Sequence, residues 1–303
     1  MTSTPTPTTA PPSPRSQPDA AQPGYVPTVG EPIVQLRDAT LRFGDREVWS
    51  GLTTDIVGGE FLAVLGPNGS GKTSLLRVLL GLNRLASGTV TVCGRPPRRG
   101  SNTVGYVPQQ RAFDRDLPLR GRDLVRLGLD GHRWGMGRPS RQARRRVDDA
   151  LDEVGATDFA DAPVGLLSGG EQQRLRIAQA LLGDPKILLC DEPLLSLDLF
   201  HQQEVSSLID RRRREAGTAV VFVTHEINPV LPLVDRVLYL VGGRWVVGRP
   251  DEVMTTDVLS ELYGTTVDVL RVRDRLVVVG APDASNDGLC GDGHHHGSHR
   301  DGC

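Results

Sequence analysis

Residues 66–73 read Gly66-Pro67-Asn68-Gly69-Ser70-Gly71-Lys72-Thr73. The apolar run from Phe61 to Leu65 precedes them and is typical of a buried strand, while residues 73–82 have the apolar spacing of a helix. Glycines in such a turn let several backbone N–H groups point inward, and the following helix N-terminus adds its positive dipole end. A strand, a G-x-x-x-x-G-K-[ST] turn and a helix together predict a phosphate-binding loop.

Each side chain of this loop has an expected role. The Lys72 ammonium group is expected to reach the β- and γ-phosphates of a nucleotide, and the Thr73 hydroxyl to ligate Mg²⁺. The expected nucleotide-binding residues of the loop are Gly66, Pro67, Asn68, Gly69, Ser70, Gly71, Lys72 and Thr73.

Strand and helix signals alternate along much of the chain. After the loop, strand signals return at 103–107, 187–190, 219–224 and 237–241, and helical patterns at 171–183 and 201–215 separate them. This alternation predicts an α/β fold with a mainly parallel sheet covered on both faces. A polar helical block at 117–167 interrupts it and indicates an inserted α-helical subdomain.

A second apolar run ends in two carboxylates, Ile187-Leu188-Leu189-Cys190-Asp191-Glu192. Asp191 is expected to hold Mg²⁺, directly or through water, because carboxylate oxygens are preferred ligands of this ion. Glu192 is expected to polarise the attacking water as general base.

The segment Leu167-Ser168-Gly169-Gly170-Glu171-Gln172-Gln173-Arg174 resembles the signature of ATP-binding-cassette (ABC) ATPases. The resemblance implies that Ser168, Gly169 and Gly170 contact the γ-phosphate of a nucleotide held by a second subunit. Glu171 replaces the usual Gln. A serine followed by glycines also suits the start of a helix, and both interpretations can hold.

Four more positions match the family's motifs. Ser196-Leu197-Asp198 resembles the D-loop at the dimer seam, and His225 matches the switch histidine that contacts the γ-phosphate. Gln109 matches the glutamine that reaches Mg²⁺ and the membrane partner, with Gln110 as an alternative. Phe43 has the place of the aromatic that stacks on adenine; the alternative is a core phenylalanine in a strand.

The resemblance spans about residues 33–250 and implies a P-loop NTPase fold. It implies a mainly parallel central sheet, an N-terminal antiparallel β subdomain and an inserted helical subdomain at about 110–168. It further implies ATP hydrolysis with Mg²⁺, pairing with a second and identical ATPase subunit, and transmembrane permease subunits as partners. The expected location is the cytoplasmic face of the cell membrane, as a peripheral protein.

The sequence divides into four expected regions. Residues 1–30 carry eight prolines and almost no large apolar side chains, so they cannot bury enough surface to offset the entropy of ordering. We expect a disordered tail at 1–30, the ATPase domain at 31–250, an appendage at 251–280 and a second disordered tail, containing His and Cys, at 281–303.

Composition argues against a nucleic-acid-binding protein and against a membrane-spanning one. A formal net charge of −2 argues against a nucleic-acid partner, since acidic neighbours offset the local arginine runs. No apolar run approaches the length of about 18 residues that spans a bilayer, so we expect another chain to supply the membrane pathway. The four cysteines show no metal or disulfide-framework spacing, which favours a reducing compartment.

Two features favour a transition-metal cargo. The segments 113–128 and 224–230 and the appendage are similar to zinc- and manganese-importing cassettes, which work with an extracytoplasmic metal-binding protein. Imidazole groups in the last tail also suit zinc, although a tail without function is equally open. The candidate tail ligands are His294, His295, His296 and His299.

Other cargoes, such as an iron chelate or an exported lipid, stay open. Soluble cassette ATPases that act on DNA or ribosomes fit less well. The ribosomal kind has two cassettes in one chain, and this sequence has one phosphate-binding loop and one signature. The DNA-repair kind needs a long insertion between Lys72 and Ser168, and the intervening segment is too short and lacks sustained heptads.

Overall fold

The computed structural model describes residues 32–109, 113–130 and 140–280. The expected disordered tails at 1–30 and 281–303 lie outside these residues. The alternative glutamine Gln110 and the candidate metal ligands His294, His295, His296 and His299 lie outside them as well.

A six-stranded sheet forms the centre of the molecule, in the order β5-β6-β7-β3-β8-β9. Five strands run parallel: β5 (Val104–Val107), β6 (Ile187–Asp191), β7 (Ala219–Val223), β3 (Phe61–Leu65) and β8 (Arg236–Val241). The edge strand β9 (Arg244–Gly248) pairs antiparallel with β8. All residues of β3, β6 and β7 are buried, which explains their unbroken apolar sequences. The mainly parallel sheet predicted from the sequence is confirmed.

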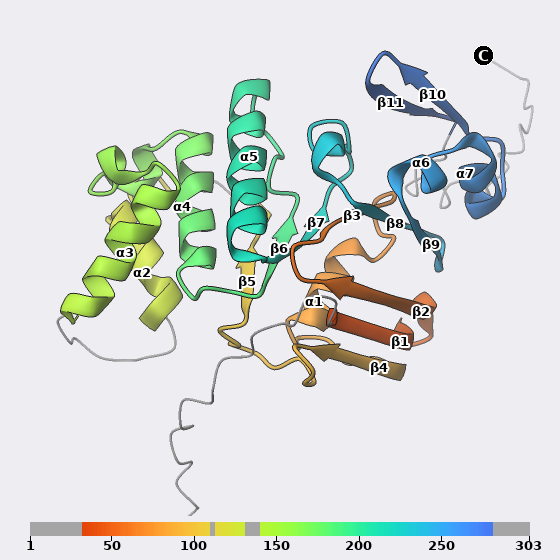
Figure 1. Cartoon of the computed structure of the whole chain (residues 1–303), viewed down its shortest axis with the longest axis horizontal. Helices are drawn as coiled ribbons and strands as arrows, with labels where there is room; N and C mark the ends of the chain where they lie inside the picture. Colours follow the sequence, from red (N-terminus) through yellow and green to blue (C-terminus); the bar gives the residue numbers. More distant parts are fainter. Residues whose placement is uncertain (1–31, 110–112, 131–139, 281–303) are drawn as a thin grey trace, which may run out of the picture.

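A second, antiparallel sheet covers one side of the central sheet. It has the order β2-β1-β4, with β2 at Arg46–Val57, β1 at Pro32–Phe43 and β4 at Ser87–Val92. Its apolar side chains, such as the fully buried Trp49, form one core with the helix α1 (Lys72–Leu79) and with the β3 residues Leu62 and Val64. Figure 1 shows α1 beside this sheet, so the helix after the phosphate-binding loop is packed between two sheets.

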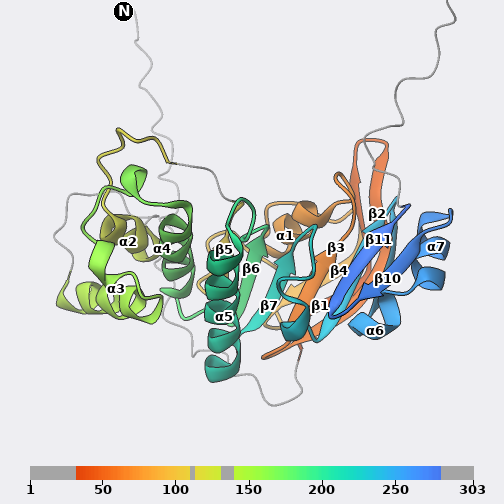
Figure 2. The ribbon, with the colours of Figure 1, turned by 90° about the horizontal axis from the view of Figure 1, so that it is seen from above.

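The helices α2 (Gly121–Asp130), α3 (Arg141–Glu153) and α4 (Gly169–Leu181) form a separate group at one end of the molecule (Figures 1 and 2). Short 3₁₀ turns at Thr157–Phe159 and Val164–Leu166 join α3 to α4. The long helix α5 (Leu199–Ala216) lies between this group and the antiparallel sheet. The helical patterns at 171–183 and 201–215 therefore correspond to α4 and α5, each displaced by one or two residues.

The last part of the chain packs beyond β8 and β9, at the opposite end from α2 and α3 (Figure 2). In this part α6 (Pro250–Val253) and α7 (Thr256–Tyr263) lead to a two-stranded hairpin of β10 (Asp268–Val272) and β11 (Arg275–Val279), while a 3₁₀ turn at Leu231–Leu233 precedes β8. The inner face of the hairpin, with Leu276 buried, joins the larger hydrophobic core. Within the described ranges, no helix combines the length and apolarity that crossing a membrane requires.

Candidate active site

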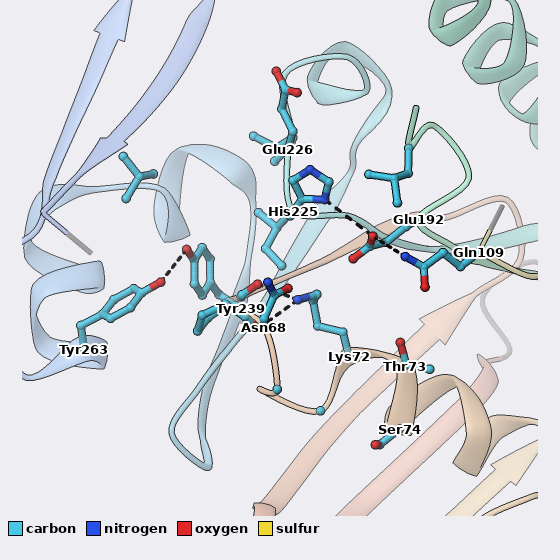
Figure 3. Close-up of a pocket in the computed structure, with 18 of the residues that line it drawn as sticks. Asn68, Lys72, Thr73, Ser74, Gln109, Glu192, His225, Glu226, Tyr239 and Tyr263 are labelled. Atoms are coloured by element: carbon cyan, nitrogen blue, oxygen red, sulfur yellow. Dashed lines mark hydrogen bonds and ion pairs between the residues drawn. The ribbon is translucent and has the colours of Figure 1, made fainter. Parts of the chain in front are cut away.

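One cavity of about 1200 Å³ opens at the C-terminal edge of the parallel strands. It brings together residues that are far apart in the sequence, from the end of β1 to the hairpin β10–β11. Eleven of the predicted site residues line it: Phe43, Gly66, Pro67, Asn68, Gly69, Gly71, Lys72, Thr73, Gln109, Glu192 and His225. Figure 3 shows that Lys72, Glu192 and His225 approach this cavity from three different segments.

The loop between β3 and α1 has a backbone that only glycine allows at two positions. Gly66 has φ of +139°, and a Cβ there would lie 2.1 Å from the Leu240 carbonyl oxygen. Gly71 has φ of +98°, and its Cβ would lie 2.4 Å from Val48 Cγ1. The loop therefore fits tightly between β8 and β2, which fixes the direction of its N–H groups.

Lys72 curls back over this loop. Its Nζ donates hydrogen bonds to the carbonyl oxygens of Gly66 at 2.7 Å and Pro67 at 3.0 Å. Burial lowers the pKa of the Lys72 ammonium group, while the charges of Glu192 and Asp191 raise it in part. A cation held in this way can exchange carbonyl contacts for phosphate oxygens without leaving the cavity.

Thr73 and Asp191 form an oxygen-rich pair at the ends of α1 and β6. The Thr73 hydroxyl donates to Asp191 Oδ1 at 3.0 Å, and the Tyr106 hydroxyl donates to Asp191 Oδ2 at 3.4 Å. Burial raises the pKa of the Asp191 carboxyl group, and these two hydrogen bonds partly oppose that effect. Burial and Asp191 raise the pKa of Tyr106 to about 12. A hydroxyl and a carboxylate at this distance are the hard oxygen ligands that suit Mg²⁺.

Glu192 stands directly after this pair, with two partners at one carboxylate oxygen. Gln109 Nε2 donates to Glu192 Oε2 at 3.2 Å, and His225 Nδ1 lies 3.8 Å from the same oxygen (Figure 3). Glu192 has φ of +48°, an uncommon conformation for a residue with a side chain, and its N–H is held by the Val223 carbonyl at 3.0 Å. Strain of this kind is typical of functional sites. The arrangement presents a carboxylate that can orient a water molecule and take its proton.

The structure places the signature residues outside this cavity. Ser168 begins α4 as its N-cap, and Glu171 Oε2 accepts from the Ser168 N–H at 2.7 Å and its hydroxyl at 2.8 Å. Glu171, the departure from the family pattern, therefore completes a capping box. Gly169 and Gly170 form the first turn of α4.

Asp198 is also outside the cavity and begins α5. Its carboxylate accepts from the His201 backbone N–H at 2.9 Å, and the His201 Nδ1 lies at the same distance. These two contacts with His201 lower the pKa of Asp198. The His201 ring covers Gly170, where an added Cβ would lie 2.4 Å from His201 Cδ2. Asp198 and the signature thus adjoin each other.

Ser70 is buried within the loop between β3 and α1 and does not line the cavity either.

Phe43 is half exposed and lines the cavity, so it is not a core residue. Sequence reasoning did not find Arg46, which lines the cavity beside it, or Tyr106, which contacts Asp191. It also did not place the hairpin strand β11 at the cavity. Arg46 lies three positions after Phe43 and Tyr106 three positions before Gln109, and this proximity in sequence was the signal that could have found them.

Comparison with known proteins identifies the family of this chain. The family model described as ABC transporter matches residues 49–195. The chain is 35% identical over 233 residues to the zinc import ATP-binding protein ZnuC of Roseobacter denitrificans, covering 77% of this chain and 85% of that protein. It is 29% identical over 248 residues to the manganese transport system ATP-binding protein MntB of Halalkalibacterium halodurans, covering 82% of this chain and 98% of that protein.

A solved structure shows the same fold. It is an inward-facing ABC transporter assigned to the metal-chelate type, with a TM-score of 0.69 and 27% sequence identity. The similarity covers 82% of this chain and 96% of that one.

Proposed function

This chain belongs to the ABC transporter ATPases, and from that premise we propose that it powers the import of a transition-metal ion, zinc or manganese. It is the ATP-binding subunit of an ABC transporter, and its activity is ATP hydrolysis. The observation that carries the site assignment is the convergence at one cavity of Lys72, Thr73 and Glu192.

ATP binds with its phosphates in the loop between β3 and α1. The loop N–H groups and Lys72 hold the phosphate oxygens, and adenine stacks on the exposed face of Phe43. Thr73 and Asp191 would hold Mg²⁺, and the side-chain oxygen of Gln109 would be a further ligand. The bound ion supplies positive charge that offsets the negative charge of the phosphate groups.

Hydrolysis uses the carboxylate of Glu192. A water oxygen attacks the γ-phosphorus while the bond from that phosphorus to the bridging oxygen of ADP breaks, and Glu192 takes the proton of the water. The products are ADP and inorganic phosphate. His225 contacts the γ-phosphate, and Gln109 holds the Glu192 side chain in place through the 3.2 Å hydrogen bond.

A second copy of this chain completes each site. Ser168, Gly169, Gly170 and Asp198 lie outside their own cavity, at the starts of α4 and α5. A helix start offers N–H groups to an anion. In a head-to-tail homodimer these residues would therefore contact the nucleotide held by the partner.

Support for the metal cargo comes from the relatives, whose names specify zinc import and manganese transport. The structural neighbour of the metal-chelate type favours a chelated metal as the second candidate. The further partners in this proposal are transmembrane permease subunits at the cytoplasmic face of the membrane and, indirectly, an extracytoplasmic metal-binding protein.

The test is to purify the chain with its native membrane partners and measure ATP turnover with and without the binding protein. Stimulation by zinc- or manganese-loaded binding protein, and its loss in Glu192→Gln, is the expected result. Turnover that depends on Glu192 but is stimulated only by a metal chelate would replace the free ion by the chelate as cargo. Turnover that ignores every metal would refute the metal assignment.

A further inference from the structure

The loop after β7 carries His225 and is tied to the C-terminal hairpin by one side chain. Asn228 Nδ2 donates to the Leu276 carbonyl oxygen at 3.0 Å, and the Leu276 N–H donates to Asn228 Oδ1 at 2.8 Å. Both hydrogen-bonding ends of the amide are thus used on one backbone residue of β11, which lies 48 positions further along the chain.

The hairpin is held at the cavity by a few contacts, of which apolar packing of Leu276, Val269 and Val278 against the larger core is one. It forms its own two-stranded sheet, in which Leu276 stands opposite Arg271, and a two-stranded sheet has marginal stability alone. Hydrogen bonds also fix the start of β10 to α7: the Val269 N–H donates to Thr256 Oγ1 at 3.0 Å, and the Val267 N–H, just before β10, donates to Ser260 Oγ at 3.0 Å. The buried Leu276 side chain adds apolar packing. The hydrogen bonds of Asn228 therefore join β11 directly to the loop of His225.

The same stretch of β11 also forms a wall of the active-site cavity. Leu276, Val277 and Val278 line it together with His225 and Asn228. Within the loop, the Thr224 hydroxyl donates to the Glu226 carbonyl at 2.9 Å and accepts from the Glu226 N–H at 3.1 Å. The His225 side chain itself is more than half exposed and stands 3.8 Å from Glu192. The imidazole therefore lies in the open cavity with little packing around it. Its position depends on the position of the loop backbone.

We propose that Asn228 is a positioning residue for ATP hydrolysis, because it joins β11 to the loop that carries His225 and so fixes the place of His225 beside Glu192. The hairpin is then a part of the catalytic unit, although none of its residues touches the reacting atoms. The proposal rests on the proposed contact between His225 and the γ-phosphate. Loss of the hydrogen bonds between Asn228 and Leu276 lets His225 move. The loop that binds the phosphates keeps its own contacts.

The test compares Asn228→Ala with a matched control, Thr256→Val, in the full chain with its membrane partners. Thr256→Val removes a hydrogen bond that fixes the hairpin to α7 and does not touch the loop of His225. We expect Asn228→Ala to lower kcat by on the order of tenfold with KM changed by less than about threefold, since small misplacement of a reacting group is costly. Thr256→Val should leave kcat within about twofold of the parent. Equal losses in the two variants would overturn the proposal, as would an unchanged kcat in Asn228→Ala.

The His225→Ala background separates this proposal from the assignment of His225. If Asn228 acts through His225, adding Asn228→Ala to His225→Ala changes kcat by less than about twofold. A further tenfold loss would mean that Asn228 acts elsewhere, which overturns the inference and leaves the role of His225 standing. If His225→Ala alone has no effect on kcat, the assignment of His225 fails, and the inference fails with it. Asn228→Asp, which keeps the acceptor and loses the donor, should give an intermediate kcat and serves if the alanine variant does not fold.

Discussion

The side-chain amide of Gln109 donates a hydrogen bond of 3.2 Å to the Glu192 carboxylate, across 83 positions of sequence. The two residues follow β5 and β6, which are neighbours in the parallel sheet, so the fold itself brings them together. The contact orients the group that we assign as general base. Gln109, Thr73 and Asp191 also line one smaller cavity together.

Glu192→Gln is expected to abolish turnover and to leave ATP binding intact. The substitution keeps the size of the side chain but removes the proton acceptor, and loss of a general base costs about 10²–10⁴-fold in rate. Steady-state phosphate release and equilibrium ATP binding measure the two effects separately. Glu226→Gln is the matched control, because Glu226 lines the same cavity and is exposed. If Glu226→Gln were as inactive as Glu192→Gln, the assignment of the base would be wrong.

Lys72→Ala is expected to weaken ATP binding by about ten- to a hundredfold, because the hydrogen bonds from a charged group to the phosphates are lost. The Lys72 ammonium group is held over the loop by the Gly66 and Pro67 carbonyl oxygens and is ready to meet phosphate. Titration with a fluorescent ATP analogue measures the affinity. Lys186→Ala, which changes the only other lysine of the chain, should leave the affinity unchanged because Lys186 does not line the cavity. An affinity in Lys72→Ala equal to that of the parent would contradict the phosphate-binding role.

Thr73→Val is expected to raise the Mg²⁺ concentration that gives half-maximal turnover by about tenfold or more, whereas Thr73→Ser should be near the parent. Valine keeps the shape of threonine but removes the hydroxyl that contacts Asp191 at 3.0 Å. Turnover measured over a Mg²⁺ titration at saturating ATP checks this. An unchanged requirement in Thr73→Val would remove Thr73 from the ligand set.

Gly66→Ala is expected to destabilise the fold by roughly 2–5 kcal/mol, from backbone strain and a clash with the Leu240 carbonyl. Gly94→Ala is the control, since Gly94 also has positive φ (+70°) but an added Cβ there has nothing within 4 Å. That control should cost only about 1 kcal/mol. Chemical denaturation of both variants measures the difference. Equal costs would show that strain, and not the close fit of the loop against β8, dominates at Gly66.

Glu60 provides a test of pH dependence. Burial raises the pKa of its carboxyl group, which outweighs the opposing effects of the Val57 N–H and of Arg236. The folded chain therefore holds this proton at a pH where the unfolded chain has released it, so the contribution of Glu60 to stability falls as pH rises above about 4.5. The unfolding free energy of the parent, relative to Glu60→Gln, should decrease from pH 4 to pH 7. A relative increase over that range would contradict the raised pKa.

The sequence was sufficient for the elements that carry motifs. β3, β6 and β7 are buried on both faces, so their apolar runs stand out, and α1 follows directly from the glycine loop. The long strand β2 could not be predicted, because its sequence shows no regular alternation of apolar and polar residues. Its pairing with β1 shifts register several times, and Gly51 within it has φ of +64°, so its apolar side chains do not alternate regularly.

The site was predictable where one segment supplies both the motif and its geometry. Lys72 and Thr73 are examples, because the loop and the start of α1 hold them. The contact of Asn228 with Leu276 depends on how the last hairpin folds back on the molecule, and no local pattern encodes it. Likewise, the capping role of Glu171 required the observed start of α4.

The most direct test of the central claim is uptake of radiolabelled zinc and manganese by cells that lack this chain and are complemented with the parent or with Glu192→Gln. The account predicts that the parent restores uptake of one of these ions and that Glu192→Gln, at equal protein level, does not. Uptake restored equally by Glu192→Gln, or unaffected by loss of the chain for both ions, would contradict it.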